Sequence, residues 1–331
     1  MNFHQLVRQI LVIINGERTI AAPYHLLKGK KSSQTLEDVA LFRLHSFYRI
    51  MPQLERSVYD HAILALEQQG VLTIVNEKSY HIKSLPYKTY HFNGWRYQGL
   101  EALFFKRLQL VVQTLSHYKA QDMKFAPVVS DNGVQQFIRQ FLQQADYRHS
   151  DLSAALYEEI FGTLKRAVIT EEQRMLISYR LSGYEQPAKT VAQLAQLTNS
   201  ATIDVQLMLT EALHVWLDTV DTPLLEALRQ GCVSEQILTD TAAKTYALIK
   251  QGYDFAQICN YRQLKESTIQ DHIVEIARNM PAFDVTPYVD FKALASVHQA
   301  TKQLQTKRLK TLHAQTGLPY FQIRLALTRE G

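Results

Sequence analysis

The sequence predicts a mainly α, multi-module helix-turn-helix protein with an N-terminal winged helix and one small β-hairpin. Three observations predict this class. Apolar residues recur at helical spacing along most of the 331 residues, polar capping sequences open several of these helices, and one short pair of strands interrupts them. The composition, 46% hydrophobic and 20% charged, is that of a folded chain. We therefore expect several packed helical modules.

The first module is expected at residues 1–83. A helix ends at Asn15-Gly16, a second short helix covers residues 20–28, and a longer one lies between Pro52 and Gly70. Two strands follow at 71–75 and 79–82, with a turn at 76–78. Helices followed by a small hairpin are typical of a winged helix, which is a compact DNA-binding module.

Residues 84–169 are expected to form an aromatic and basic linker with a helical connector. Aromatic residues alternating with cations can stack on bases and hold phosphates. Packing of these rings on neighbouring helices is the favoured interpretation, because aromatic stripes are usually buried. Helices are then predicted at 100–119, 134–144 and 153–166, with a break at Asn132-Gly133. The aromatic residues concerned are Tyr87, Tyr90, His91, Phe92, Trp95 and Tyr97.

A helix-turn-helix layout is predicted within residues 170–233. Capping-box patterns begin at Thr170 and Thr190, and the helix that starts at Thr170 is expected to end at Gly183. A short helix, a turn at Asn199 and a longer helix over 202–218 complete the layout. The unit is similar to region four of sigma factors.

A second helix-turn-helix is predicted at residues 234–331, followed by a basic C-terminal tail. Asp254 and Ser267 each begin a capping-box pattern, and Cys259 takes a small buried position. The apolar stripe of the last helix of the motif leaves its N-terminal end exposed, where such helices meet base edges. The candidate DNA-binding residues there are Lys265, Ser267, Thr268, Gln270 and His272.

Charge is distributed unevenly along the chain, whose net charge is +5. Residues 131–234 carry 8 basic and 13 acidic residues, which makes them a poor electrostatic partner for DNA and a candidate for docking a protein or a basic surface of this chain. Basic residues gather at the two ends, where they can neutralise phosphates. The candidates are Lys28, Lys30, Lys31, Ser32, Ser33 and Gln34 in the first module, and Lys302, Lys307, Arg308, Lys310 and Arg324 in the tail.

The sequence gives no positive sign of catalysis, a cofactor or a metal site. It has no GxG, GxSxG or HExxH motif, and the run from Lys28 to Ser32 fails as a phosphate loop because Tyr24 stands where the first glycine is required. Cys232 and Cys259 lie far apart and form no CxxC, which fits a reducing cytoplasm. No segment approaches a membrane span, and no signal peptide is expected.

Stretches near both ends of the chain carry a resemblance to known families. Residues 252–273 and the Tyr-x-x-Ile-Arg pattern at 320–324 resemble the helicase helix-turn-helix family, a module also found at the C-terminus of RecQ-type helicases. Residues 15–20, 24–27 and 29–35 resemble the YpbB-like family of Firmicutes, which are standalone relatives encoded beside a RecQ-type helicase.

The resemblance implies a non-catalytic DNA-binding accessory protein, in the cytoplasm at the nucleoid, that acts with a RecQ-like helicase in DNA repair or recombination. Single-strand-binding protein is a further partner that it implies. The chain has no Walker loop and no DExH box, so it would act in trans. Two alternatives remain open: a sequence-specific transcription regulator, suggested by Thr268-Ile269-x-x-His272, and a protein-interaction scaffold, suggested by the acidic middle.

Overall fold

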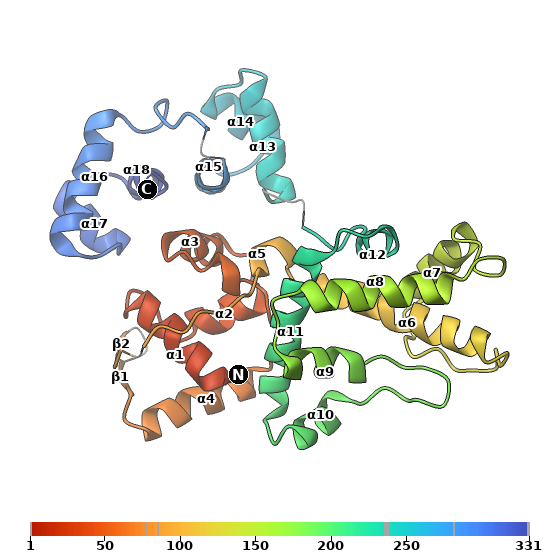
Figure 1. Ribbon diagram of the computed structural model, residues 1–331. Helices are drawn as coiled ribbons and strands as arrows, with labels where there is room; N and C mark the ends of the chain where they lie inside the picture. Colours follow the sequence, from red (N-terminus) through yellow and green to blue (C-terminus); the bar gives the residue numbers. More distant parts are fainter. Residues whose placement is uncertain (1, 77–78, 85, 235–237, 281, 330–331) are drawn as a thin grey trace.

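The structure is a computed structural model that describes residues 2–76, 79–84, 86–234, 238–280 and 282–329. Within these residues the chain forms eighteen α-helices, one 3-10 turn and a two-stranded antiparallel hairpin, which confirms the predicted fold class. Figure 1 shows three groups of helices, which we call the N-terminal unit (2–83), the middle unit (97–232) and the C-terminal unit (238–329). None of the helices in the described part of the chain is long and apolar enough to span a membrane.

The N-terminal unit is built on α1, whose side chains from Phe3 to Ile14 form one buried face. The hairpin pairs Leu72 with Ile82, and the Tyr80 hydroxyl donates to the Leu11 carbonyl at 3.0 Å, which fixes the hairpin on α1. Glu77 and Lys78, in the predicted hairpin turn, lie outside the described residues. The elements are α1 (Phe3–Ile14), α2 (Ala22–Lys28), α3 (Ser33–Leu41), η1 (His45–Phe47), α4 (Arg56–Gln68), β1 (Leu72–Asn76) and β2 (Ser79–Ile82).

The aromatic segment after the hairpin packs onto the helices, as the favoured interpretation predicted. Tyr90, Phe92 and Tyr97 are all buried, whereas Tyr87 remains 71% exposed. The short helix α5 (Gly94–Tyr97) begins at a glycine because a Cβ there would lie 2.4 Å from the Tyr48 carbonyl oxygen. The three buried rings therefore hold the linker in place and are not free to stack on bases, whereas the Tyr87 ring faces solvent.

The middle unit has one hydrophobic core that draws on residues from Tyr97 to Cys232. Trp216 lies at its centre, packs edge-on against Phe104 and donates from its indole nitrogen to the Thr163 hydroxyl at 2.9 Å. The core continues without interruption across residues 169 and 170, where the sequence analysis separates a connector from a helix-turn-helix. The helices are α6 (Glu101–Lys119), α7 (Asn132–Gln144), α8 (Leu152–Arg166), α9 (Glu171–Tyr179), α10 (Val191–Leu197), α11 (Thr202–Thr219) and α12 (Pro223–Arg229).

Two predicted boundaries in the middle unit are wrong. Asn132-Gly133 begins α7 instead of breaking a helix, because the Asp131 side chain accepts from the Val134 N–H at 3.1 Å and caps it. The helix after Thr170 ends at Tyr179 and not at Gly183. The capping boxes predicted at Thr170 and Thr190 are both present.

The C-terminal unit packs α13, α14 and α15 around Ile258, Ile269 and Ile273. Cys259 is only partly buried beside them. The capping box at Asp254 is present, but the one predicted at Ser267 is wrong because α15 already begins at Glu266. The helices are α13 (Asp240–Lys250), α14 (Phe255–Arg262), α15 (Glu266–Asn279), α16 (Phe291–Leu304), α17 (Leu309–Thr316) and α18 (Tyr320–Leu327).

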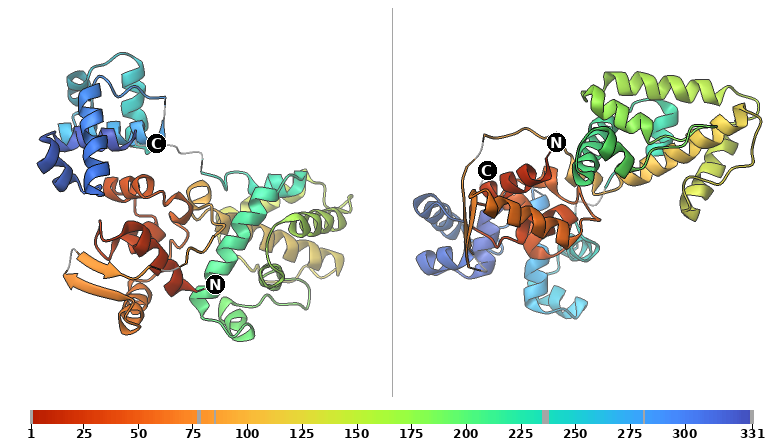
Figure 2. Two further views of the ribbon diagram at one scale, coloured as in Figure 1. Left: turned by 60° about the vertical axis from the view of Figure 1, so that its left-hand side comes forward. Right: turned by 90° about the horizontal axis from the view of Figure 1, so that it is seen from below.

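The C-terminal unit lies on the N-terminal unit, with α15 against α3, although the two are far apart in sequence (Figure 2). Glu37 of α3 is the centre of this contact. Its carboxylate accepts from Arg324 at 3.1 Å and lies 4.0 Å from Arg278, and Arg324 also donates to Asp271 at 2.6 Å. The contact therefore includes a largely buried ion cluster that neither unit could neutralise alone.

Candidate nucleic-acid interface

Helices α14 and α15 form a short helix, a tight turn and a longer helix. Asp254 and Gln257 form a reciprocal capping box at the start of α14. The C-cap residue of this helix, Gln263, adopts a left-handed conformation with φ of 52°. Lys265 is then the N-cap residue of α15. This is the arrangement in which the first turn of the second helix is presented to DNA.

The first turns of α15 bring four of the five predicted residues to the surface. Lys265 and Ser267 are exposed, and Thr268 and Gln270 are half-buried. No side chain caps the N-terminus of α15, so its free backbone N–H groups and helix dipole favour an anion at this end. The cation and the hydroxyls around it are the groups that contact phosphates and base edges in such motifs.

His272 does not belong to this surface, contrary to the sequence prediction. It is 7% exposed, and its Nδ1 lies 2.9 Å from the Thr245 hydroxyl, which in turn accepts from Arg262 at 2.7 Å. Burial, together with the positive charge of Arg262, lowers the pKa of His272. The neutral imidazole therefore joins α15 to α13. Position 272 is buried because helical periodicity places it on the inward face of α15, beside Ile269 and Ile273.

Two exposed tyrosines near the turn were not among the predicted site residues. Tyr261 is 68% exposed and Tyr253 37% exposed, and their ring centroids lie 5.8 Å apart. Exposed rings are suited to stacking on unpaired bases. The signal in the sequence is that Tyr261 lies off the apolar stripe of α14, which Ile258 and Cys259 occupy.

The predicted residues of the N-terminal unit lie together in the turn between α2 and α3. Lys30, Lys31, Ser33 and Gln34 are exposed, whereas Ser32 accepts from the Thr35 N–H and serves as the N-cap of α3. The Lys28 ammonium lies 3.4 Å from both the Tyr24 hydroxyl and the Leu54 carbonyl. Burial, together with the nearby cations Lys30 and Arg56, lowers the pKa of His25 beside this turn.

Three of the five predicted tail residues hold the C-terminal unit on the N-terminal unit. The Lys307 ammonium donates to the Leu41 carbonyl at 3.1 Å, Arg308 donates to the Gly16 carbonyl, and Arg324 pairs with Glu37. The structure thus gives these three cations contacts within the chain in place of the predicted phosphates. Lys302 and Lys310 are exposed.

The middle unit turns its helix-turn-helix towards the N-terminal unit. The first turn of α11 packs Ile203 on the N-terminal core, and Asp204 accepts from the Phe3 N–H at 2.7 Å. Leu207, one turn later, is fully buried in the same core. The middle unit therefore docks within this chain through apolar packing and a backbone hydrogen bond, and not through the basic surface that its charge suggested.

Groups of three or more His, Cys, Asp or Glu side chains placed to hold a metal ion are absent from the described residues. At the start of α15 the candidate surface has the Lys265 ammonium, the hydroxyls of Ser267 and Thr268 and the carboxylate of Glu266.

Comparison with known proteins gives two matches. Residues 241–327 match the family described as a helix-turn-helix domain, a region that contains α14 and α15. The whole chain is similar to protein YpbB of Bacillus subtilis (strain 168), with 28% identity over 346 aligned positions that cover 99% of this chain and 97% of that protein. No solved structure matches the chain. The matched domain indicates a DNA-binding protein.

Proposed function

Because the chain is YpbB-like over nearly its whole length and has a helix-turn-helix domain at its C-terminal end, we propose that it is a non-catalytic DNA-binding accessory protein of a RecQ-like helicase. It would act in trans during DNA repair or recombination, in the cytoplasm at the nucleoid. The C-terminal unit would make the principal DNA contact.

The observation that carries the DNA-binding part is the exposed N-terminal end of α15. Lys265 and Ser267 face solvent there, no side chain caps the helix N-terminus by a hydrogen bond, and the exposed carboxylate in the first turn is that of Glu266. In the other helix-turn-helix the equivalent end of α11 is partly covered, because Ile203 packs on the N-terminal core and Asp204 accepts from the Phe3 N–H, although Thr202 stays exposed. Of the two motifs, the C-terminal one therefore presents the more open first turn to DNA.

The roles of the individual groups follow from their chemistry. Lys265, with Lys30 and Lys31 of the N-terminal unit, would neutralise phosphates. Removal of these lysines should therefore lower the affinity for DNA uniformly across sequences. Thr268 and Gln270 would donate hydrogen bonds to base edges or phosphates, and Tyr261 would stack on unpaired bases. A preference for forked or single-stranded DNA is the expected consequence of the exposed ring.

Fluorescence anisotropy with duplex, forked and single-stranded DNA at two salt concentrations tests this part. The full chain should bind with a steep salt dependence, and the double variant Lys265→Ala, Thr268→Ala should bind about tenfold more weakly. Lys189→Ala is the matched control, because Lys189 is an exposed lysine beside the other helix-turn-helix. Absence of salt-sensitive binding to all three DNAs would contradict the proposal.

The helicase part needs a separate measurement. The purified chain and a RecQ-like helicase from the same genome, both treated with nuclease, should co-elute in gel filtration, and unwinding of a forked duplex should be faster with the chain present. Addition of single-strand-binding protein tests whether it joins the complex. An unchanged unwinding rate together with separate elution would exclude the accessory role and leave DNA binding intact.

A further inference from the structure

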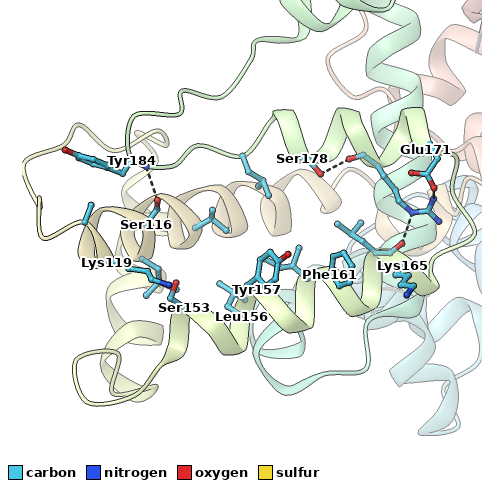
Figure 3. A pocket seen from close by; sticks show the side chains of 17 residues that line it. Ser116, Lys119, Ser153, Leu156, Tyr157, Phe161, Lys165, Glu171, Ser178 and Tyr184 are labelled. Carbon is cyan, nitrogen blue, oxygen red and sulfur yellow. Dashed lines mark hydrogen bonds and ion pairs between the residues drawn. The ribbon is translucent and has the colours of Figure 1, made fainter.

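A long apolar groove runs across the middle unit between α6, α8 and α9, far in sequence from both basic ends (Figure 3). Its volume is about 1070 Å³. Leu115 of α6, Leu156 and Ile160 of α8, and Leu181 after α9 supply apolar surface along it. No described part of the chain fills this space.

Two aromatic rings stand on the α8 side of the groove. Tyr157 and Phe161 are 61% and 53% exposed, lie one helical turn apart and stack with their centroids at 6.0 Å and an interplanar angle of 13°. Large rings normally lose most of their surface to the core, so a stacked and exposed pair beside an apolar groove indicates a surface that another molecule covers.

The ends of the groove are basic although the unit as a whole is acidic. Lys119 at the end of α6 and Lys165 at the end of α8 stand at opposite ends of the groove, and both are exposed (Figure 3). Among the described residues neither of them has an ion-pair partner. Arg174, by contrast, is held by Glu171 at 2.5 Å and by the Leu164 carbonyl at 3.1 Å. Two free cations therefore flank the apolar floor.

The length of the groove fits three turns of an α-helix. Ser153 and Lys165, which line it near its two ends, are twelve residues apart on α8, which corresponds to about 18 Å at 1.5 Å per residue. A groove of this length, with apolar side chains at every turn and cations at both ends, has the features of a helix-in-groove site.

We propose that this groove docks a short amphipathic helix of a partner protein, about three turns long, that places apolar side chains against Tyr157 and Phe161 and carboxylates against Lys119 and Lys165. The site does not depend on the DNA-binding function. It gives the acidic middle unit a role as a protein dock while the two ends of the chain contact DNA.

A synthetic peptide tests the proposal. The probe is a fluorescent helix of about 14 residues with leucines at i, i+4 and i+7 and glutamates at both ends, and the control peptide has lysines in place of these glutamates. The full chain should bind the acidic probe at least about tenfold more tightly than the basic one. The double variant Tyr157→Ser, Phe161→Ser should bind the acidic probe about tenfold more weakly.

Charge reversal separates specific docking from non-specific hydrophobic binding. The double variant Lys119→Glu, Lys165→Glu should exchange the preference and bind the basic peptide better, and all variants should keep the circular dichroism spectrum and DNA affinity of the parent chain. Equal binding of both peptides by every variant, or no binding of either, would overturn the proposal. So would a parent chain that dimerises in sedimentation while Tyr157→Ser, Phe161→Ser does not, because the occupant would then be a second copy.

Discussion

Helices α11 and α15 are the second helices of two helix-turn-helix motifs in one chain, yet they have opposite environments. In α11 the buried residues surround the helix, and its first turn is packed on the N-terminal unit. In α15 the buried residues form one face, and the first turn is exposed. The helix-turn-helix motif alone therefore does not define a DNA-reading surface. The packing against the first turn of the second helix decides whether the motif can contact DNA.

Two polar residues of α11 also make hydrogen bonds inside the molecule. Glu211 accepts from the His91 N–H at 2.8 Å, and His214 accepts from the Asn93 N–H at 2.9 Å. These side chains satisfy backbone groups of the linker that would otherwise be buried without a partner. The acidic character of the middle unit thus has a structural use, since its carboxylates hold a segment of the same chain.

The largest expected effect is on stability, at the covered end of α11. Leu207→Ala removes a fully buried side chain between the two units and should lower the free energy of unfolding by about 2–5 kcal/mol. Urea unfolding measures this free energy. Thr268→Ala, in the first turn of α15, should change the free energy of unfolding by less than about 0.5 kcal/mol. Similar losses for the two variants would show that the starts of α11 and α15 are packed alike.

The next effect concerns the contact between the C-terminal and N-terminal units. Glu37→Gln removes the carboxylate that faces Arg278 and leaves Arg324 with Asp271 alone, at a largely buried site, so it should cost about 1–3 kcal/mol. Limited proteolysis should then cut between α12 and α13 faster than in the parent chain. Glu158→Gln, at an exposed carboxylate on α8, is the control and should leave both measurements unchanged. A proteolysis rate equal to that of the parent chain would show that the ion cluster does not hold the units together.

A smaller effect is expected on DNA affinity at the exposed end of α15. Lys265→Ala should weaken binding by a few-fold, and the slope of log affinity against log salt should fall by about 1, because one phosphate contact is lost. Asp204→Ala, near the start of α11, should leave the slope unchanged, since the carboxylate of the half-buried Asp204 accepts from the Phe3 N–H. A salt slope that responds to Asp204→Ala but not to Lys265→Ala would reverse our assignment of the two motifs.

The smallest effect is a pH dependence of stability from His272. Because burial and Arg262 lower its pKa below the ordinary value of 6.5, the unfolded chain binds a proton first as the pH falls. The contribution of His272 is therefore complete well above pH 6.5 and is lost as the pH falls through and below that value. His272→Asn should reduce the difference between urea midpoints at about pH 7.5 and about pH 5.5. An unchanged difference would show that His272 is not buried as a neutral group.

Local sequence patterns predicted much of the fold and part of the candidate site. The apolar stripe of α1, the capping boxes at Thr170 and Thr190, and the hairpin all depend on interactions between residues close in sequence, which a single sequence displays. The start of α15 was placed two residues too late because Lys265 has no capping side chain to mark it. Lys265 and Ser267 were found because they precede an apolar stripe.

The amino-acid sequence by itself determined the helices, their caps, the uneven charge and the two helix-turn-helix motifs, because these follow from neighbours within a few residues. Only the tertiary structure decided which motif is free. The contact of Asp204 with Phe3 and that of Arg324 with Glu37 each join residues more than 200 positions apart, and no local periodicity encodes such pairs. Lys307 and Arg324 hold the units together, whereas Lys265 faces solvent. The charge of these residues could not predict this difference, because a cation can pair inside the chain or bind a phosphate, and its burial decides which.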